Sequence, residues 1–278
     1  MAVAPTPTPS GGLRYQLQLF FTALQFFTRL PAPGWIGFDA AWLQHAARYF
    51  PAVGIIVSLA CAVVYWLAAL WLPQVVAVLL STAAGIYLTG AFHEDGFADV
   101  CDGFGGGMQP SRVLEIMRDS RVGAYGVIGI VLLLATKLAG LTSLPALQVI
   151  PALLIAHPLS RCFAAALIWR MPYVREEGKV KPLAQSMSNG EFAVAVVTAA
   201  LPLVVCVAAG WLALQALLLA MLLGGAATWF LARKFQRRIG GYTGDCLGAV
   251  QQFSEVAIYL GLLAAASVSM SVSPASHS

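Results

Sequence analysis

Charge is scarce in this sequence. Only 10% of its 278 residues are Asp, Glu, Lys or Arg, whereas 59% are hydrophobic, and the mean hydropathy is +0.80. Residues 49–93 and 192–232 contain no charged side chain at all. A membrane-spanning helix needs about 20 apolar residues, so each of these stretches is long enough for two spans. The composition therefore excludes an ordinary soluble domain and predicts a protein of the lipid bilayer.

Cysteine is also sparse, and its spacing excludes two further classes. The five cysteines show no CxxC pair, which argues against a zinc site or a disulfide framework, and we expect them to be reduced and structural; they are Cys61, Cys101, Cys162, Cys206 and Cys246. The net charge of +4 is ordinary for the loops of a membrane protein and gives no indication of nucleic-acid binding.

The apolar runs predict an all-α, polytopic transmembrane helix bundle. Two helices are expected in 49–93, turning near Pro73, and two in 192–232, turning near Gly210. Single spans are expected at 122–141, 148–170 and 256–272, which makes seven. Residues 13–30 are apolar at helical spacing but interrupted by glutamines, so they form either an eighth span or, as we favour, a helix in the membrane interface. We expect one integral-membrane domain over 13–272, between a disordered tail at 1–12 and a short tail at 273–278.

Basic residues follow alternate spans, and this pattern predicts the orientation. Counted in pairs, the spans place four basic groups on one side: Arg48; Arg112, Arg118 and Arg121; Arg170, Arg175, Lys179 and Lys181; Arg233, Lys234, Arg237 and Arg238. The turns on the other side contain neither Lys nor Arg. The positive-inside rule makes the basic side cytoplasmic. Lys137 lies towards the opposite side, where its long side chain is expected to snorkel to the surface.

Half of the twelve acidic residues fall between positions 94 and 119, on the predicted cytoplasmic side. On a helix, Asp95, Asp99 and Asp102 would lie within roughly 60° of one another, with Glu94 further round. Carboxylates that share one face repel unless a cation lies among them, and oxygen ligands suit magnesium, calcium or manganese. The run predicts a metal site; the alternative is a solvated acidic loop.

Glycines and arginines follow the acidic run. A glycine-rich turn that includes Gly105 and Gly106 would let backbone N–H groups approach an anion, although no Walker A lysine is present. Arg118 and Arg121, and with less weight Arg112, are candidates to bind phosphate oxygens in bidentate fashion. The alternative is that these arginines only set the orientation in the membrane.

Three further polar residues are candidates for the same site. Asp245 lies in a glycine-rich segment on the predicted cytoplasmic side. It is a candidate second-site metal ligand or general base, and the alternative is that it only caps a helix. Glu255 is expected at the start of the last span, where a helix tolerates an acid. Arg161 lies deep within an apolar run, where we expect it to pair with an acid of the site or with a substrate phosphate.

Five motifs, in this order along almost the whole chain, carry a family resemblance. They are Phe27-Thr28-Arg29-Leu30-Pro31-Ala32-Pro33, Tyr49-Phe50-Pro51-Ala52-Val53-Gly54, His93-Glu94-Asp95-Gly96-Phe97-Ala98-Asp99 with Asp102-Gly103, Met117-Arg118-Asp119-Ser120-Arg121-Val122-Gly123, and Gly241-Tyr242-Thr243-Gly244-Asp245-Cys246-Leu247-Gly248-Ala249. Together they resemble the cobalamin synthase, or adenosylcobinamide-GDP ribazoletransferase, family. The sequence departs from the family pattern at Glu94, where Leu is frequent.

This resemblance implies a magnesium-dependent transferase of the bacterial inner membrane, with its active site facing the cytoplasm. Adenosylcobinamide-GDP and α-ribazole, or its 5′-phosphate, would be joined to adenosylcobalamin or its phosphate, with release of GMP. Asp95, Asp99 and Asp102 would hold Mg²⁺, and Arg118 and Arg121 would bind the pyrophosphate. Asp119 and Asp245 are both candidates for the general base, and the choice between them is open. The sequence is compatible with a homo-oligomer.

Two rival classes share some of these features. The segment Asp99-Val100-Cys101-Asp102-Gly103 fits the first positions of the motif of CDP-alcohol phosphotransferases, but residues 104–107 break that motif and its second half is absent from the sequence. A secondary transporter would carry single acids within spans and two inverted halves, whereas the acids here cluster with glycines and arginines.

Overall fold

The structure is a computed structural model that describes residues 12–37, 39–174 and 185–272. Within these ranges it contains helices, turns and a single isolated β-bridge between Tyr173 and Tyr242. The helices are α1 (Leu13–Phe27), α2 (Ala40–Ala46), the 3₁₀ turn η1 (Ala47–Tyr49), α3 (Phe50–Ala69), α4 (Gln74–Thr89), α5 (Phe92–Gly106), α6 (Pro110–Ile116), α7 (Ala124–Ser143), α8 (Ala146–Arg170), α9 (Asn189–Ala208), α10 (Leu214–Ile239) and α11 (Gly244–Val272). Residues 1–11 of the predicted N-terminal tail (1–12), the predicted tail at 273–278, and Arg175, Lys179 and Lys181 lie outside the described residues.

The predicted bundle is confirmed. Six of the described segments are long and apolar enough to cross a membrane, and a bent pair, α4 with α5, makes a seventh if it counts as one span. The expected turns are where the sequence placed them: α4 begins directly after Pro73, and Gly210 adopts a left-handed φ of 71° between α9 and α10. Hydropathy therefore predicted the order of the spans, and the expected seven are reached when α4 and α5 count as one span.

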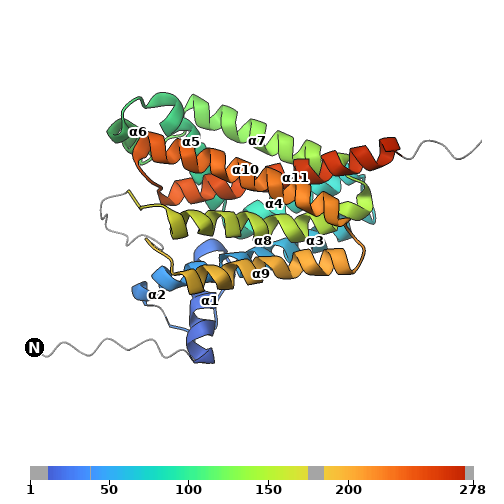
Figure 1. Cartoon of the computed structure of the whole chain (residues 1–278), viewed down its shortest axis with the longest axis horizontal. Helices are drawn as coiled ribbons and strands as arrows, with labels where there is room; N and C mark the ends of the chain where they lie inside the picture. The colour runs from blue at the N-terminus through green and yellow to red at the C-terminus, as the bar shows by residue number, and fades with distance from the viewer. Residues whose placement is uncertain (1–11, 38, 175–184, 273–278) are drawn as a thin grey trace, which may run out of the picture.

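The first helix does not run with the others. In Figure 1, α1 lies across the direction of the long helices at one end of the bundle. It is 15 residues long, which is short for a span of about 20 residues. Leu19, Ala23 and Phe27 are buried on one side of it, as expected of an amphipathic helix that covers the bundle. This arrangement fits the interfacial alternative for residues 13–30 rather than an eighth span.

The last helix differs from its prediction. We expected a span at 256–272 with Glu255 at its start, but α11 begins at Gly244, and Glu255 lies well inside it and is fully buried. α11 packs against α5, α7, α8 and α10. α8 and α11 are the most enclosed of the candidate spans, each with 78% of its apolar window buried within the protein. Polar side chains on these two helices therefore face protein rather than lipid.

Candidate active site

The acidic run forms a helix that follows a sharp bend. The chain bends by 89° between α4 and α5. The break lies at Gly90 and Ala91, whose φ angles of 66° and 59° are both in the left-handed region. Gly90 adopts this conformation without penalty, whereas Ala91 does so at a cost of roughly 1–2 kcal/mol. The bend carries the acids to the end of the bundle at which α6 lies (Figure 1).

The four acids of α5 have different surroundings. Glu94 is buried, and its Oε1 accepts a hydrogen bond of 2.8 Å from Gln252 Nε2 on α11. Asp95 is exposed and Asp99 is half-buried one turn later. Asp102 is buried against the start of α7. The helix therefore directs Glu94 into the bundle and leaves Asp95 accessible.

Asp102 ties the acidic helix to the arginine loop at 117–123. Its Oδ2 accepts a 2.7 Å hydrogen bond from the backbone N–H of Gly123, and its Oδ1 accepts one of 2.8 Å from that of Gly126. A Cβ at either glycine would overlap the carboxylate. Asp102 thus satisfies N–H groups in the first turn of α7 that have no partner within their own helix. This contact explains why residues 123 and 126 have no side chain.

The two predicted site segments lie against each other. A Cβ on Gly96 of α5 would lie 3.0 Å from the Cα of Asp245, and one on Gly248 of α11 would lie 3.1 Å from the carbonyl oxygen of His93. These close approaches place the first turn of α11 on α5, with Asp245 directly beside Gly96. The structure therefore brings Asp245 next to the segment that carries Asp95 and Asp99.

Among the described residues, no three His, Cys, Asp or Glu side chains lie close enough together to hold a metal ion. Glu94 bonds Gln252, and Asp102 bonds backbone N–H groups, so both carboxylates hold α5 against its neighbours. Asp95 is exposed, Asp99 lies one turn later, and Asp245 lies beside α5. All three carry the hard carboxylate oxygens that magnesium prefers, and the metal site stays a prediction.

The predicted glycine-rich turn is helical, which corrects our expectation. Gly105 and Gly106 form the last turn of α5, and the N–H of Gly107 donates to the carbonyl oxygen of Gly103 at 2.9 Å. The absence of side chains serves packing: a Cβ on Gly105 would overlap the ring of Tyr125. A helical backbone uses its own N–H groups, so these glycines do not form the anion-binding loop that we expected.

An open groove of about 520 Å³ lies between the end of α5, α6 and the start of α7. Its lining includes five residues singled out from the sequence: Asp102, Gly106, Arg112, Asp119 and Arg121. Arg118 is exposed in the same loop but is not part of this lining. The groove therefore gathers the end of the acidic helix and most of the arginine loop at one surface.

Asp119 is held by Arg121. Arg121 Nη2 donates to Asp119 Oδ2 at 2.7 Å, and Nε donates to Oδ1 at 3.0 Å. These side-chain hydrogen bonds, with a further one from the backbone N–H of Arg121, lower the pKa of the Asp119 carboxyl to about 2. A group with so low a pKa is a weak base at neutral pH, because general-base catalysis favours a pKa near the working pH.

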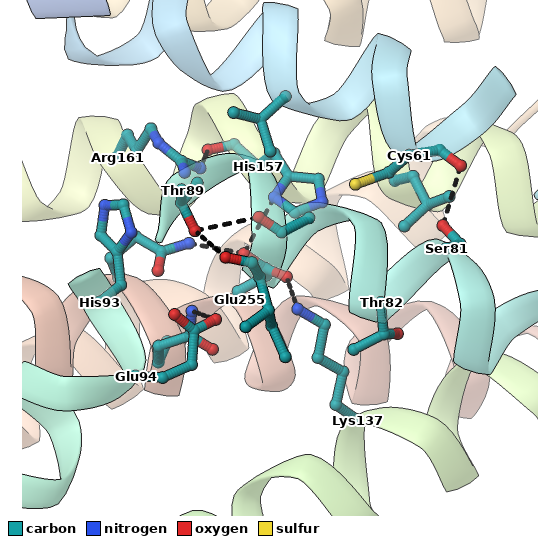
Figure 2. Close-up of a pocket in the computed structure, with 16 residues that line it drawn as sticks. Cys61, Ser81, Thr82, Thr89, His93, Glu94, Lys137, His157, Arg161 and Glu255 are labelled. Atoms are coloured by element: carbon teal, nitrogen blue, oxygen red, sulfur yellow. Dashed lines mark hydrogen bonds and ion pairs between the residues drawn. The ribbon is translucent and has the colours of Figure 1, made fainter. Parts of the chain in front are cut away.

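A second polar cluster lies inside the bundle (Figure 2). Glu255 occupies its centre: Lys137 Nζ lies 2.6 Å from Glu255 Oε1, and His157 Nδ1 lies 3.2 Å from Oε2. Lys137 is only 5% exposed, so our expectation that it snorkels to the surface was wrong. Its charge is balanced within the protein.

Arg161 also belongs to this interior cluster. It is 3% exposed, and its Nη1 donates to the carbonyl oxygen of His157 at 3.1 Å. Arg161 and Glu94 both line a small cavity of about 20 Å³ beside Glu255, which is room for a water molecule. Arg161 lines this interior cavity together with Glu94 and Glu255 and does not line the groove, so the structure does not place it beside the expected substrate phosphate.

Sequence reasoning missed several members of this cluster. Gln251 Nε2 donates to Glu255 Oε2 at 2.5 Å and to Ser160 Oγ at 3.1 Å, and Tyr259 OH donates to Glu255 Oε1 at 3.2 Å. One feature of the sequence could have indicated these residues: Gln251, Gln252 and Glu255 interrupt an apolar run at helical spacing. Polar residues within a span generally find partners inside the bundle.

Known proteins are similar in sequence to almost the whole of this chain. Residues 19–263 match the family model described as cobalamin-5-phosphate synthase. A relative from Leptothrix cholodnii, called adenosylcobinamide-GDP ribazoletransferase, is 47% identical over 259 residues, covering 91% of this chain and 97% of its own. Two relatives of the same name are each 44% identical to this chain. The one from Shewanella frigidimarina matches 92% of this chain and 98% of its own length. The one from Ralstonia pickettii matches 91% of this chain and 97% of its own length. No solved structure gives a significant match. The chain therefore belongs to the cobalamin-5-phosphate synthase family.

Proposed function

We propose that this protein joins adenosylcobinamide-GDP to α-ribazole or its 5′-phosphate, forming adenosylcobalamin or its phosphate and releasing GMP. The proposal rests on near-full-length similarity to relatives that bear the name of this transferase. The groove supports it as well, because Arg112 and Arg121 line an open surface at the end of α5, the helix that carries the acids Asp95 and Asp99. An enzyme that breaks a pyrophosphate needs both kinds of group.

In the proposed reaction, a ribazole hydroxyl attacks the phosphorus that stays with the corrinoid. One phosphorus–oxygen bond forms, the pyrophosphate bridge breaks, and the bridging oxygen leaves with GMP. Arg121 and Arg112, which line the groove, would bind nonbridging oxygens of the pyrophosphate. Arg118, exposed in the same loop, would bind the approaching substrate.

Asp95 and Asp99 are the metal ligands that we propose, with Asp245 beside them. Magnesium, when bound, would neutralise the charge that builds on the leaving oxygen. Asp102 would act as a positioning residue instead, because its oxygens hold Gly123 and Gly126 and thereby fix the start of α7 relative to α5. Glu94, bonded to Gln252 inside the bundle, would likewise orient α5.

Asp245 is the preferred general base. Asp119 is held by Arg121, and its low pKa makes it a poor proton acceptor. Asp245 lies at the start of α11, beside the acidic helix. It would take the proton from the attacking hydroxyl.

We further propose that the end of the bundle that carries the groove faces the cytoplasm of a bacterial inner membrane. The basic residues of α6, the loop at 117–123 and the last turn of α10 support this orientation.

Turnover with defined substrates tests the proposal. Detergent-purified protein is incubated with adenosylcobinamide-GDP and α-ribazole 5′-phosphate, with Mg²⁺ or with EDTA, and both GMP and the corrinoid product are measured. We expect GMP and product to form in step, and only with Mg²⁺. Folded protein that releases no GMP would contradict the proposal.

A matched pair of variants tests the ligand assignment. Asp95→Asn should lower turnover at least about a hundredfold, as for the loss of an electrostatic contact to the transition state. Asp39→Asn changes an acid that caps α2, where Asn caps equally well, and should leave turnover intact. Asp95→Asn protein that retains more than about a tenth of wild-type activity would contradict the assignment.

A further inference from the structure

The groove has the size of a nucleotide site. Its volume of about 520 Å³ lies within the range of roughly 300–1,000 Å³ that is usual for small-molecule sites. Three elements form it: the end of α5, one face of α6, and the segment from Asp119 to Tyr125. Together they contribute an aromatic ring, carboxylates and arginines, the kinds of group that recognition of a base and its phosphates requires.

Tyr125 provides an aromatic surface. It lies in the first turn of α7 and is 58% exposed. The absence of a side chain at Gly105 lets the ring lie directly against α5, because a Cβ there would be 2.5 Å from the ring. A ring that packs against α5 on one side and lines the groove is suited to stacking with a base, as aromatic side chains do in single-stranded nucleic-acid complexes.

Glu115 provides a carboxylate on the adjoining helix. Its side chain is 68% exposed, and Arg112 Nη1 donates to Glu115 Oε2 at 2.8 Å. Guanine presents two adjacent donors, N1–H and the 2-amino group, which match the two acceptor oxygens of a carboxylate. Adenine presents an acceptor at N1, which the acceptor oxygens of the Glu115 carboxylate would repel. Asp119 lines the groove as well, but Arg121 engages both of its oxygens.

We infer that this groove binds the guanosine end of the nucleotide substrate, with Tyr125 stacking on guanine and Glu115 accepting hydrogen bonds from its Watson–Crick edge. Arg112 and Arg121 lie in the same lining and serve the phosphates. The inference rests on the proposed function, since it takes the GDP moiety as part of the substrate. It adds the residues that select guanine over other bases.

Nucleotide binding in the absence of corrinoid tests this assignment separately from turnover. The affinities of GDP, IDP and ADP for the detergent-purified full chain are measured by calorimetry in Mg²⁺ buffer. We expect GDP to bind tightest, IDP more weakly because it lacks the 2-amino group, and ADP most weakly. Glu115→Gln should reduce the preference for GDP over ADP about tenfold, because the amide keeps one acceptor and adds a donor.

Substitutions at Tyr125 test the stacking surface. Tyr125→Leu should weaken GDP, IDP and ADP alike by about tenfold, because stacking does not depend on the base. Tyr125→Phe keeps the ring and should restore most of the affinity that Leu loses. Asp39→Asn serves as the control for the loss of an acidic charge elsewhere on the protein and should bind GDP as the wild type does.

The two hypotheses fail in different ways. Equal affinity of the wild type for GDP and ADP, or a GDP preference that Glu115→Gln leaves intact, would overturn the guanine site even if turnover is normal. GDP-selective binding that depends on Glu115, in protein that forms no corrinoid product, would contradict the proposed reaction and leave the guanine site standing.

Discussion

Two acid–base pairs in this protein have similar chemistry and opposite surroundings. Arg121 and Asp119, at the groove, are 87% and 39% exposed, whereas Lys137 and Glu255, in the interior cluster, are 6% and 1% exposed. Solvent and salt weaken the interaction within an exposed pair, and its members exchange partners readily. A buried pair leaves an uncompensated charge if one member is removed. Arg121 can therefore also reach a substrate phosphate, whereas the buried pair serves the fold.

Removal of the central interior acid should have the largest effect. Glu255→Ala leaves Lys137 buried without its counter-charge, which typically costs about 3–5 kcal/mol. We expect little folded protein, or a greatly lowered Tm in detergent. The double variant Lys137→Met with Glu255→Leu removes both charges and should recover much of the lost stability. A single variant as stable as the wild type would show that the pair does not support the fold.

The matching change at the groove should affect activity and leave stability alone. Arg121→Gln removes an exposed phosphate ligand, and we expect kcat/KM to fall by about tenfold to a hundredfold with the Tm unchanged. Steady-state kinetics and thermal unfolding of the same preparation check both parts. A Tm drop comparable to that of Glu255→Ala would contradict the contrast between the two regions.

The link between α5 and α7 should give an intermediate effect. Gly126→Ala places a methyl group against the Asp102 carboxylate, and overpacking of this kind costs about 1–3 kcal/mol. We expect a lower Tm together with reduced turnover, since the arginine loop shifts with α7. Gly225→Ala is the matched control: this glycine lies within α10 with open space around it, so alanine should be neutral or stabilise the helix by up to about 1 kcal/mol. Equal effects of the two substitutions would argue against the Asp102 contact.

Asp119→Asn should have the smallest effect, a nearly unchanged dependence of kcat/KM on pH. The carboxyl of Asp119 has a lowered pKa of about 2, so its interaction with Arg121 is complete above the ordinary Asp pKa and is lost only as the pH falls through about 2. Asp119 therefore stays ionised throughout an assay between about pH 5 and 9. We expect Asp119→Asn to leave the acidic limb of the profile of kcat/KM against pH in place. A shift of that limb in Asp119→Asn would return Asp119 to the role of base.

The acidic helix illustrates how far sequence patterns reach. The spacing of Asp95, Asp99 and Asp102 correctly indicated residues on neighbouring turns of a helix, because helical periodicity is a local property. It did not indicate that Asp102 bonds the amides of Gly123 and Gly126, which are more than 20 residues away. The glycines at 105 and 106 suggested a turn by composition, yet packing against Tyr125 and Ile116 keeps them helical.

Hydropathy and charge along the chain were enough to predict a helical membrane protein, the order of its spans and the grouping of its basic residues at one end of the bundle. These properties follow from hydropathy and charge summed over about 20 residues, which tertiary contacts hardly alter. The 89° bend before α5, the approach of Asp245 to Gly96 and the pairing of Lys137 with Glu255 became visible only in the folded chain. Each depends on how helices distant in sequence rotate and cross, and a buried charge takes whichever partner that packing brings within reach.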